Sequence, residues 1–327
     1  MAFTRLELAT ISAQFSTLVG SLAQQATSKT APSTMFKTGL TGNVPQVITY
    51  VSKVALRTLN NSTLMLPHAT VATNHTADTR YLPAPVEKRA TYMFAEEAGL
   101  LRLIDMKSGW ISETNKAFQR EKDIMFVDAF LGNAITSLVW NDAATASPNP
   151  ANLQLPTTFV ALPAANTITA AAGSTITANL KKVLKFFEAN DVNWREGGLR
   201  LYHNSKFAEL LRKDPEWFTW NTAGATPNVT GELKSYLGFD FIQLSEVDVL
   251  CDKSSNPDVD GAHYNAVDKC LIAVGKPICT GIWKDFNTRI SVRHDMDDAY
   301  QVNSYMMLSS ARLNEWDVAV LDISALS

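Results

Sequence analysis

The sequence has few of the features from which a catalytic or metal-binding role is usually inferred. Its three cysteines, Cys251, Cys270 and Cys279, are an odd number without a Cys-x-x-Cys pair, so free thiols are expected rather than a disulfide framework. The stretch Gly275-Lys276-Pro277 lacks the glycine spacing and the following Ser or Thr of a phosphate-binding loop. No His-Glu-x-x-His or Gly-x-Ser-x-Gly motif occurs. We therefore expect no catalytic residues, no cofactor and no metal ligands.

Long apolar runs and a large net charge are also missing. No stretch approaches about 18 consecutive apolar residues, so no membrane-spanning helix is expected. Residues 1–5 do not form a basic region followed by an uninterrupted apolar run, so no secretory signal is expected. The formal net charge is -3, and a basic footprint typical of sequence-specific nucleic-acid binding is therefore missing. Such a chain could still line a container for DNA without gripping the DNA.

The composition indicates a folded protein with a substantial core. The 327 residues are enough for two domains of common size or one elaborated domain, and 46 % of them are hydrophobic. Charged residues make up only 19 %. A low surface charge fits a protein that hides much of its exterior in subunit contacts, although many enzymes have a similar composition.

Two acidic stretches are the candidates for ion binding. Asn256-x-Asp258-x-Asp260-Gly261 has the first half of a calcium-binding loop, but its twelfth position is Val267, where a bidentate Glu is required. We therefore favour a polar turn.

The second stretch, His294 to Asp298, concentrates the carboxylates Asp295, Asp297 and Asp298. It could raise a carboxylate pKa or bind a cation. The favoured interpretation is a solvated turn or a partner for a basic patch on a neighbouring subunit. The candidates for that patch are Arg195, Arg200, Arg212 and Lys213.

The first hundred residues predict an arm followed by a projecting hairpin. Residues 3–25 have apolar positions near helical spacing, and the chain up to about residue 45 reads as an extended arm. An apolar limb at 64–71, a polar tip at 72–80 and a second apolar limb at 89–103 then describe a long hairpin. An ordinary surface loop between strands is the alternative.

Residues 113–138 form the clearest predicted helix. Ser112 is a suitable N-cap, and Gly132 could break or bend the helix. One apolar stripe indicates the buried face; its members are Ile124, Val127, Leu131, Ile135 and Leu138.

The remaining chain predicts an α/β region followed by paired strands. Residues 142–173 read as a long connection with little regular structure. Helices are expected at 177–190 and after Ser205, which could cap a helix that ends at Asp214-Pro215. Strands are expected at 199–203, 239–244 and 270–274, and period-2 alternation marks further strands near 290–293, 300–309 and 318–323.

This order of elements resembles the major capsid proteins of tailed bacteriophages, the Hong Kong 97 phage fold. The resemblance covers most of the chain and rests on order and spacing more than on invariant residues. The segments similar to that family are 78–83 and 89–92 for its extended loop, 116–132 for its spine helix, 199–204 with Phe207, Leu210 and Leu211 for its axial domain, 231–245 for a glycine-aromatic segment, and 273–291, 300–312 and 316–323 for its closing strands.

The resemblance implies a mixed α+β fold. The implied division is a 1–45 N-terminal arm, the start of a peripheral domain at 46–61, an extended loop at 62–95, a peripheral domain with the spine helix at 96–141, an axial domain at 142–285, peripheral-domain strands at 286–312, and a C-terminal strand at 313–327 that returns to the axial domain.

The implied function is a structural major capsid protein. One chain would build the hexamers and pentamers of an icosahedral head that encloses double-stranded DNA. Implied partners are other copies of the chain, scaffolding, portal and decoration proteins, and the packaged DNA through non-specific contact, with no membrane. The implied location is the virion, after assembly in the host cytoplasm. Candidate inter-subunit contacts are Arg80, Tyr81, Leu82, Lys88, Arg89, Tyr92, Arg120, Asp295, Asp297 and Asp298.

Two other functions stay open at this point. One is an α/β enzyme with its site near Asp295 to Asp298 or near His203, which predicts a small oligomer with a deep polar pocket. The other is a different encapsulating protein of the same fold. Some capsid proteins cross-link a loop Lys to an Asn beside a Glu; Lys88 lies in the predicted loop, but the sequence identifies no partners for it.

Overall fold

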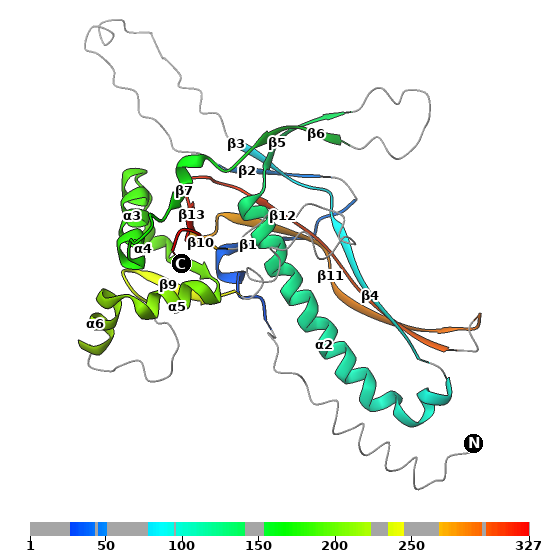
Figure 1. Ribbon diagram of the computed structural model, residues 1–327. Helices are drawn as coiled ribbons and strands as arrows, with labels where there is room; N and C mark the ends of the chain where they lie inside the picture. The colour runs from blue at the N-terminus through cyan, green and yellow to red at the C-terminus, as the bar shows by residue number, and fades with distance from the viewer. Residues whose placement is uncertain are drawn as a thin grey trace, which may run out of the picture.

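The computed structural model describes residues 27–42, 45–50, 78–94, 96–140, 154–223, 235–244, 268–295 and 299–326. These residues form three β-sheets and one long helix (Figure 1). A five-stranded sheet lies with short helices at one end of the molecule. A longer four-stranded sheet extends away from it beside the long helix.

The five-stranded sheet has the order β7 (Thr167–Thr169), β13 (Val318–Asp322), β10 (Lys269–Val274), β8 (Leu199–His203) and β9 (Phe239–Gln243). Its central strand β10 is antiparallel to both neighbours, whereas β8–β9 and β13–β7 are parallel. Residues 270–274 of β10 are all buried. A strand covered on both faces reads as a continuous apolar run, which is why the sequence predicted this strand directly.

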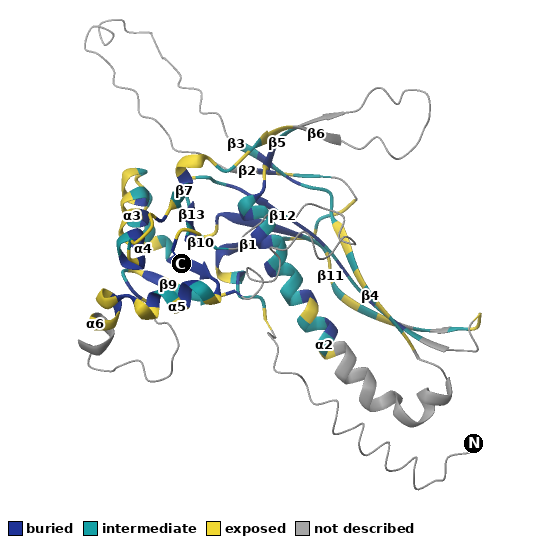
Figure 2. Ribbon diagram, viewed as in Figure 1, coloured by how far each residue is buried: buried dark blue, intermediate teal, exposed yellow. Residues whose placement is uncertain are grey.

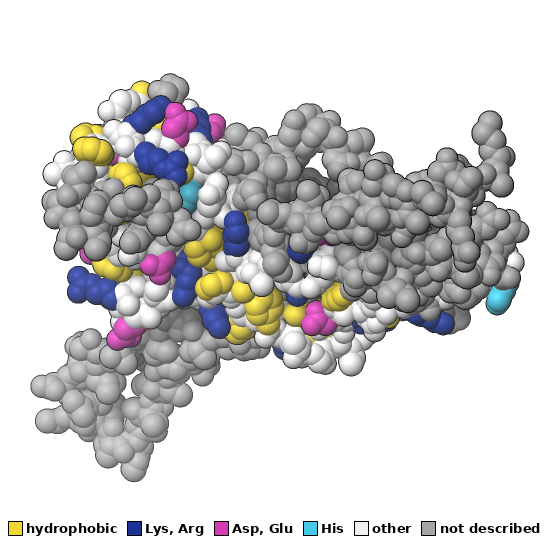
Figure 3. All heavy atoms as spheres, turned by 90° about the horizontal axis from the view of Figure 1, so that it is seen from below, with side chains coloured by type: hydrophobic (Ala, Val, Ile, Leu, Met, Phe, Trp, Pro, Cys, Tyr) yellow, Lys and Arg dark blue, Asp and Glu magenta, His cyan; other side chains and the backbone are white. Residues whose placement is uncertain are grey.

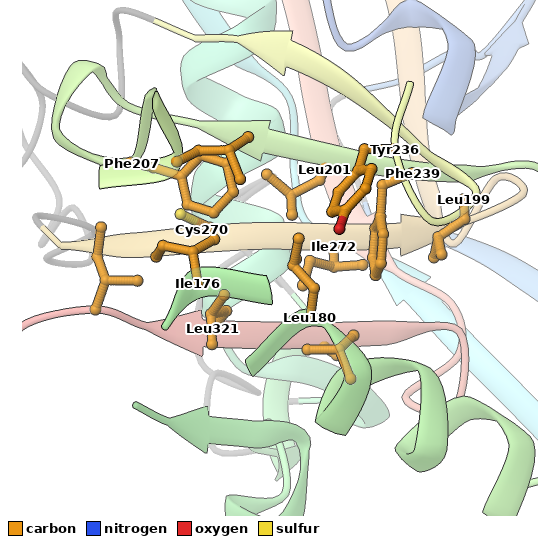
Figure 4. Close-up of a cluster of buried hydrophobic side chains, with 14 of the residues drawn as sticks. Ile176, Leu180, Leu199, Leu201, Phe207, Tyr236, Phe239, Cys270, Ile272 and Leu321 are labelled. Atoms are coloured by element: carbon orange, nitrogen blue, oxygen red, sulfur yellow. The ribbon is translucent and has the colours of Figure 1, made fainter. Parts of the chain in front are cut away.

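Helices cover one face of this sheet. They are α3 (Ile176–Ala189), the short α4 (Trp194–Gly197), α5 (Ser205–Lys213) and α6 (Pro215–Ala223). Side chains from α3 and α5 meet those of β8, β9, β10 and β13 in the largest hydrophobic cluster (Figure 4). Ile176 and Leu180 come from α3, Phe207 from α5, and Ile272 and Leu321 from the sheet.

Local capping fixes where these helices begin. The side chain of Thr175 accepts a hydrogen bond from the backbone of Ala178, and Asn204 accepts one from Phe207. The cap of α5 is therefore Asn204, one residue before the Ser205 that the sequence suggested. The buried carboxylate of Asp214 accepts from the backbone of Thr177 at 2.8 Å and of Glu216 at 3.0 Å. One carboxylate thus serves the first turns of α3 and α6 together.

The long sheet has the order β1 (Thr34–Thr38), β11 (Ile278–Arg293), β12 (Ala299–Arg312) and β4 (Val86–Phe94). β11 and β12 pair antiparallel along their length, with register shifts between Ile282 and Asn287. One face packs on helix α2 (Glu96–Leu131), where Phe118 joins the buried Met306 and Leu308. Figure 2 shows buried and half-buried residues along the described part of α2.

The third sheet has the order β2 (Gln46–Tyr50), β3 (Asp78–Leu82), β5 (Ala134–Trp140) and β6 (Gln154–Val160). Ile48 and Leu82 join a hydrophobic cluster with Cys279 of β11 and Ala311 of β12. This sheet is therefore packed on the long sheet through shared core residues.

The long helix differs from its predicted bounds. It spans Glu96–Leu131, so Ser112 lies inside it and not at its N-cap. Gly132 lies directly after its last residue, and the chain enters β5 two residues later. Ile135 and Leu138, which continued the apolar stripe, therefore belong to a strand. The three-residue spacing of Ile135 and Leu138 fits a helix and not a regular strand, but β5 has register irregularities between these two positions, and its pairing with β6 makes it a strand.

The predicted hairpin also has different limbs. Residues 78–80, expected in its polar tip, are part of β3, and β3 pairs with β2. β4 pairs instead with β12, and residues 96–103, expected in the second limb, are helical. Residues 64–71 lie outside the described residues. The pairing changes because β12 supplies β4 with an antiparallel partner over nine positions, Tyr300↔Phe94 to Leu308↔Val86.

Residues 142–173 are more regular than predicted. They contain β6, a short 3-10 turn η3 (Ala164–Asn166) and β7. β6 pairs with the preceding strand β5, and β7 pairs with the distant strand β13; both partners lie outside the segment whose composition was read.

Replacing Arg312 should destabilise the protomer strongly. Its fully buried guanidinium donates to the carbonyls of Phe130 and Gly132 at the end of α2, at 2.8 and 2.6 Å, and to Val160 at 3.0 Å. Arg312→Met leaves these carbonyls without that donor, so the free energy of unfolding should fall by about 3 kcal/mol or more. Urea denaturation measures this. The exposed Arg289→Met should change it little, and an equal loss in both variants would contradict the assignment.

Tyr202 should make stability fall at alkaline pH. Burial raises the pKa of its phenol to about 12, and its hydroxyl donates to Ser33 Oγ at 2.7 Å. The unfolded chain ionises Tyr near pH 10, so folding loses free energy as pH rises from about 10 to 12. The stability difference between the wild type and Tyr202→Phe should therefore narrow by up to about 2 kcal/mol over that range. Denaturation at several pH values would show a constant difference if this is wrong.

Candidate subunit-contact surfaces

Two of the candidate contact residues are used inside the protomer. Leu82 is 0 % exposed and lies in the cluster that joins the third sheet to the long sheet. Arg80 is also buried; its guanidinium donates to both carboxylate oxygens of Glu315, at 2.9 and 2.8 Å, and to the carbonyl of Leu313. Both side chains are thus taken up by contacts within the protomer, which disfavours these two residues as contacts to a neighbour.

The opposite face of the third sheet carries an apolar row. Val47, Tyr81, Ile135 and Phe159 are directly paired across β2, β3, β5 and β6. Paired residues share a sheet face, and Ile48 and Arg80 lie on the other one. Val47 and Phe159 are 47 % and 51 % exposed, and Tyr81 is half-buried. The row is therefore open at both ends. Val47 and Phe159 were missed from the sequence, because a single apolar residue in a strand does not indicate which face is covered.

Strand β4 has two faces with different roles. Lys88 and Tyr92 lie on the face toward α2, and Lys88 Nζ is 2.7 Å from Glu121 Oε1 of that helix. Arg89 and Met93 alternate with them and are exposed. Arg89 pairs with Glu87 on the same strand at 2.6 Å. Of the predicted contacts on β4, Lys88 and Tyr92 therefore face α2, and Arg89 faces outward.

The outer face of the long sheet is polar. Thr91 of β4 donates to Asn303 Oδ1 of β12 at 2.7 Å, and Gln301 donates to the same oxygen at 3.3 Å. Arg293 of β11 in turn donates to Gln301. Such a ladder of hydrogen bonds suits contact with water or with a polar partner surface. Figure 3 is a separate view of the molecule from below, in which hydrophobic side chains gather near the middle with Lys and Arg side chains beside them.

The acidic stretch is partly neutralised within the chain. Asp295 is exposed and accepts two hydrogen bonds from Arg293, at 2.8 and 2.7 Å. That guanidinium lowers the pKa of Asp295 to about 2, so this carboxylate stays ionised at any ordinary pH. Asp297 and Asp298 lie outside the described residues. Arg120 is half-buried on α2.

Several residues of the predicted basic patch also make contacts within their own chain. Arg200 donates to the carbonyls of Pro32 and Gly275, and Lys213 pairs with Glu209. Arg195 lies 5.2 Å from the ring of Trp194. These side chains keep their charge, but their positions are set by partners on their own chain.

Where the structure describes them, the residues named for the enzyme alternative are held by contacts within the protomer. His203 is buried, with Nδ1 2.8 Å from the carbonyl of Asn204 and its ring among Phe207 and Phe241. An open cavity of about 320 Å³ lies elsewhere, between the start of α3, the α5–α6 junction and the C-terminal Leu326. In the described ranges no group of three or more His, Cys, Asp or Glu could hold a metal ion. The calcium-like stretch 256–261 lies outside those ranges.

Comparison with known proteins decides the family. A family model described as phage capsid protein matches residues 8–324. The chain belongs to this family. It is a structural phage capsid protein and belongs to the virion. The family and the structural capsid role inferred from the sequence are confirmed. Comparison with curated protein sequences gives no match.

Solved capsid structures share the fold of this capsid protein. The capsid of cyanophage P-SCSP1u matches with a TM-score of 0.61 and 13 % identity, over 92 % of this chain and 89 % of that chain. The mature capsid of bacteriophage PhiM1 matches with 0.61 and 10 %, over 90 % and 86 %. Cyanophage Pam1 matches with 0.59 and 10 %, over 92 % and 93 %. The mixed α+β capsid fold is thereby confirmed. No helix in the described part of the chain is long and apolar enough to cross a membrane.

Two arginines from the candidate contacts should respond differently to the same substitution. Arg80→Met breaks a buried bidentate pair and leaves Glu315 without that partner, so the protomer should lose about 3–5 kcal/mol of unfolding free energy. Arg89→Met removes an exposed pair and should cost less than about 1 kcal/mol. Chemical denaturation of unassembled protein measures both. A loss for Arg89→Met as large as that for Arg80→Met would show that the two positions were assigned wrongly.

Proposed function

We propose that this protein builds hexamers and pentamers of an icosahedral head that encloses double-stranded DNA. The observation that carries the proposal is the match of the phage capsid family over residues 8–324, together with a fold that covers about nine tenths of solved capsid chains. A chain of one kind can close a shell only if the same surfaces accept slightly different neighbours at hexamers and pentamers. Extended sheets with exposed edges and faces suit that requirement.

The surfaces of the protomer support contacts on several sides. The apolar row of the third sheet contains two side chains, Val47 and Phe159, that are about half exposed. Met93 on the outer face of β4 is 44 % exposed, and Met35 and Phe36 of β1 are exposed as well. These side chains lie on two different sheets. Burying these apolar side chains against neighbouring copies would stabilise the assembly through the hydrophobic effect.

We assign the described elements to the implied domains as follows. The five-stranded sheet with α3 and α5 is the axial domain, and α2 with the long sheet is the peripheral domain. Of the N-terminal arm, 1–45, strand β1 belongs to the long sheet, and the part before residue 28 is the one that reaches a neighbouring subunit. Of the region 62–95, which contributes to the loop that crosses another subunit, β4 is joined to the long sheet. The retained contact candidates are Tyr81, Lys88, Arg89, Tyr92, Arg120, Asp295, Asp297 and Asp298.

Further partners follow from the needs of a DNA container. Scaffolding, portal and decoration proteins complete such a head, and assembly takes place in the host cytoplasm. Contact with packaged DNA is non-specific, since a chain with a net charge of -3 has no basic footprint for reading sequence. A different encapsulating protein of the same fold is distinguished by the size and symmetry of its particle.

The first test is to express the chain, with its scaffolding protein where one is known, and image the product by negative-stain electron microscopy. Closed shells tens of nanometres across, built of hexameric and pentameric units, are expected. A uniformly small particle that persists with scaffold and crowding agents present would contradict the proposal.

The apolar row should matter for assembly more than for folding. Phe159→Ser removes an exposed aromatic ring, so the protomer should lose less than about 1 kcal/mol, while the yield of shells falls several-fold. Thr158→Ala, on the other face of the same strand, should leave the shell yield near that of the wild type. Sedimentation of assembly reactions measures the yield. Equal yields for Phe159→Ser and the wild type would remove the row from the interface.

A further inference from the structure

Residues 28–34 form a short segment, here called the strap, that is held by a buried carboxylate. Asp123 of α2 is 0 % exposed. Its Oδ1 accepts from Ser28 Oγ at 2.6 Å, from the backbone N–H of Thr30 at 3.1 Å and from Thr30 Oγ1 at 2.7 Å, and its Oδ2 accepts from the N–H of Lys29 at 3.2 Å. All four donors come from three consecutive residues of the strap.

The strap is also bound to the five-stranded sheet. Ser33 Oγ accepts from the hydroxyl of Tyr202 on β8 at 2.7 Å, and Arg200 of the same strand donates to the carbonyl of Pro32 at 3.3 Å. Lys29 Nζ donates to the carbonyl of Gln243 on β9 at 2.8 Å. From Thr34 the chain continues as β1, in parallel pairing with β11. The strap therefore touches the long helix, the five-stranded sheet and the long sheet within seven residues.

We propose that the strap couples the exit of the N-terminal arm to the relative positions of α2 and the five-stranded sheet, with Asp123 as the positioning residue. This inference rests on the proposed function in one respect, that the arm contacts a neighbouring subunit. The strap fixes one exit direction for the chain before residue 28. A neighbour that binds the arm then meets every protomer in the same geometry.

The burial of the Asp123 carboxylate explains why it holds the strap in one position. A buried carboxylate needs several donors to replace its lost hydration, and here strap residues supply four of them. The strap cannot move away without uncovering that charge. Its backbone would otherwise be free to take many directions, because the short 3-10 turn η1 (Ala31–Ser33) supplies few hydrogen bonds of its own.

The test is the isosteric substitution Asp123→Asn. The amide of Asn keeps the shape of the carboxylate but replaces one acceptor oxygen with an NH₂ donor. This NH₂ then faces another donor, either the N–H of Lys29 or the groups that bind Oδ1. Hydrogen exchange of the backbone amides of residues 29–31, 33 and 34 in the unassembled protein should accelerate about tenfold or more, because their opening free energy falls. Shells should form in lower yield or with aberrant sizes, as seen by electron microscopy.

A matched control separates positioning from general stability. Asp214→Asn changes another buried carboxylate that accepts two backbone N–H groups, but it lies at α3 and α6 and not at the strap. At a temperature where denaturation shows both variants folded, Asp214→Asn should assemble normally and leave exchange in the strap unchanged. Thr30→Val, which removes one hydroxyl donor and keeps the carboxylate, should show an intermediate assembly defect.

The outcomes distinguish the inference from the proposed function. If the wild type forms no shell, the proposed function fails, and the exchange measurement still reports whether Asp123 holds the strap. If the wild type forms shells and Asp123→Asn forms the same shells in the same yield, the coupling is wrong. It is also overturned if both Asn variants lose assembly in proportion to their loss of stability, because Asp123 would then act only on folding.

Discussion

The fold depends on a buried polar junction centred on Arg312 and Glu315. Arg312, at the end of β12, donates to carbonyls at the end of α2 and to Val160 of β6. Glu315 accepts a bidentate pair from Arg80 of β3, and Asn166 donates to the carbonyls of Glu315 and Val318. The long helix and all three sheets therefore meet at one set of charges. A cation at the helix C-terminus also offsets the partial negative charge of its free carbonyls.

This junction explains how an elongated protomer holds its shape. Among the described residues, apolar packing is divided among four clusters, and two of them contain only a few residues. Non-directional packing alone would leave the angle between the sheets poorly fixed. Hydrogen bonds from a planar guanidinium require one arrangement of their acceptors, and a buried charge makes other arrangements costly. The relative positions of the surfaces proposed to meet neighbouring subunits follow from this constraint, as does the position of the strap held by Asp123.

The low sequence identity to other capsid proteins of the same fold has a related explanation. Solved capsids share this fold at 10–13 % identity. A shell needs the order of strands, the long helix and the shape of the subunit, and many side chains can satisfy those needs. The fold is therefore shared where residues are not, which is why a resemblance based on order and spacing led to the correct family.

The sequence by itself determined the elements whose signals are local. Strand β8, helix α5 and the buried strand β10 were predicted nearly as observed, because an apolar run or a capped amphipathic turn needs no distant partner to be recognised. Only the tertiary structure decided that α2 ends at Leu131, that β4 pairs with β12, and that Arg80 is buried. The partner of Arg80 lies 235 residues away. An exposed and a buried arginine look alike in a sequence, because the cost of burying the charge depends on a neighbour that only folding brings close.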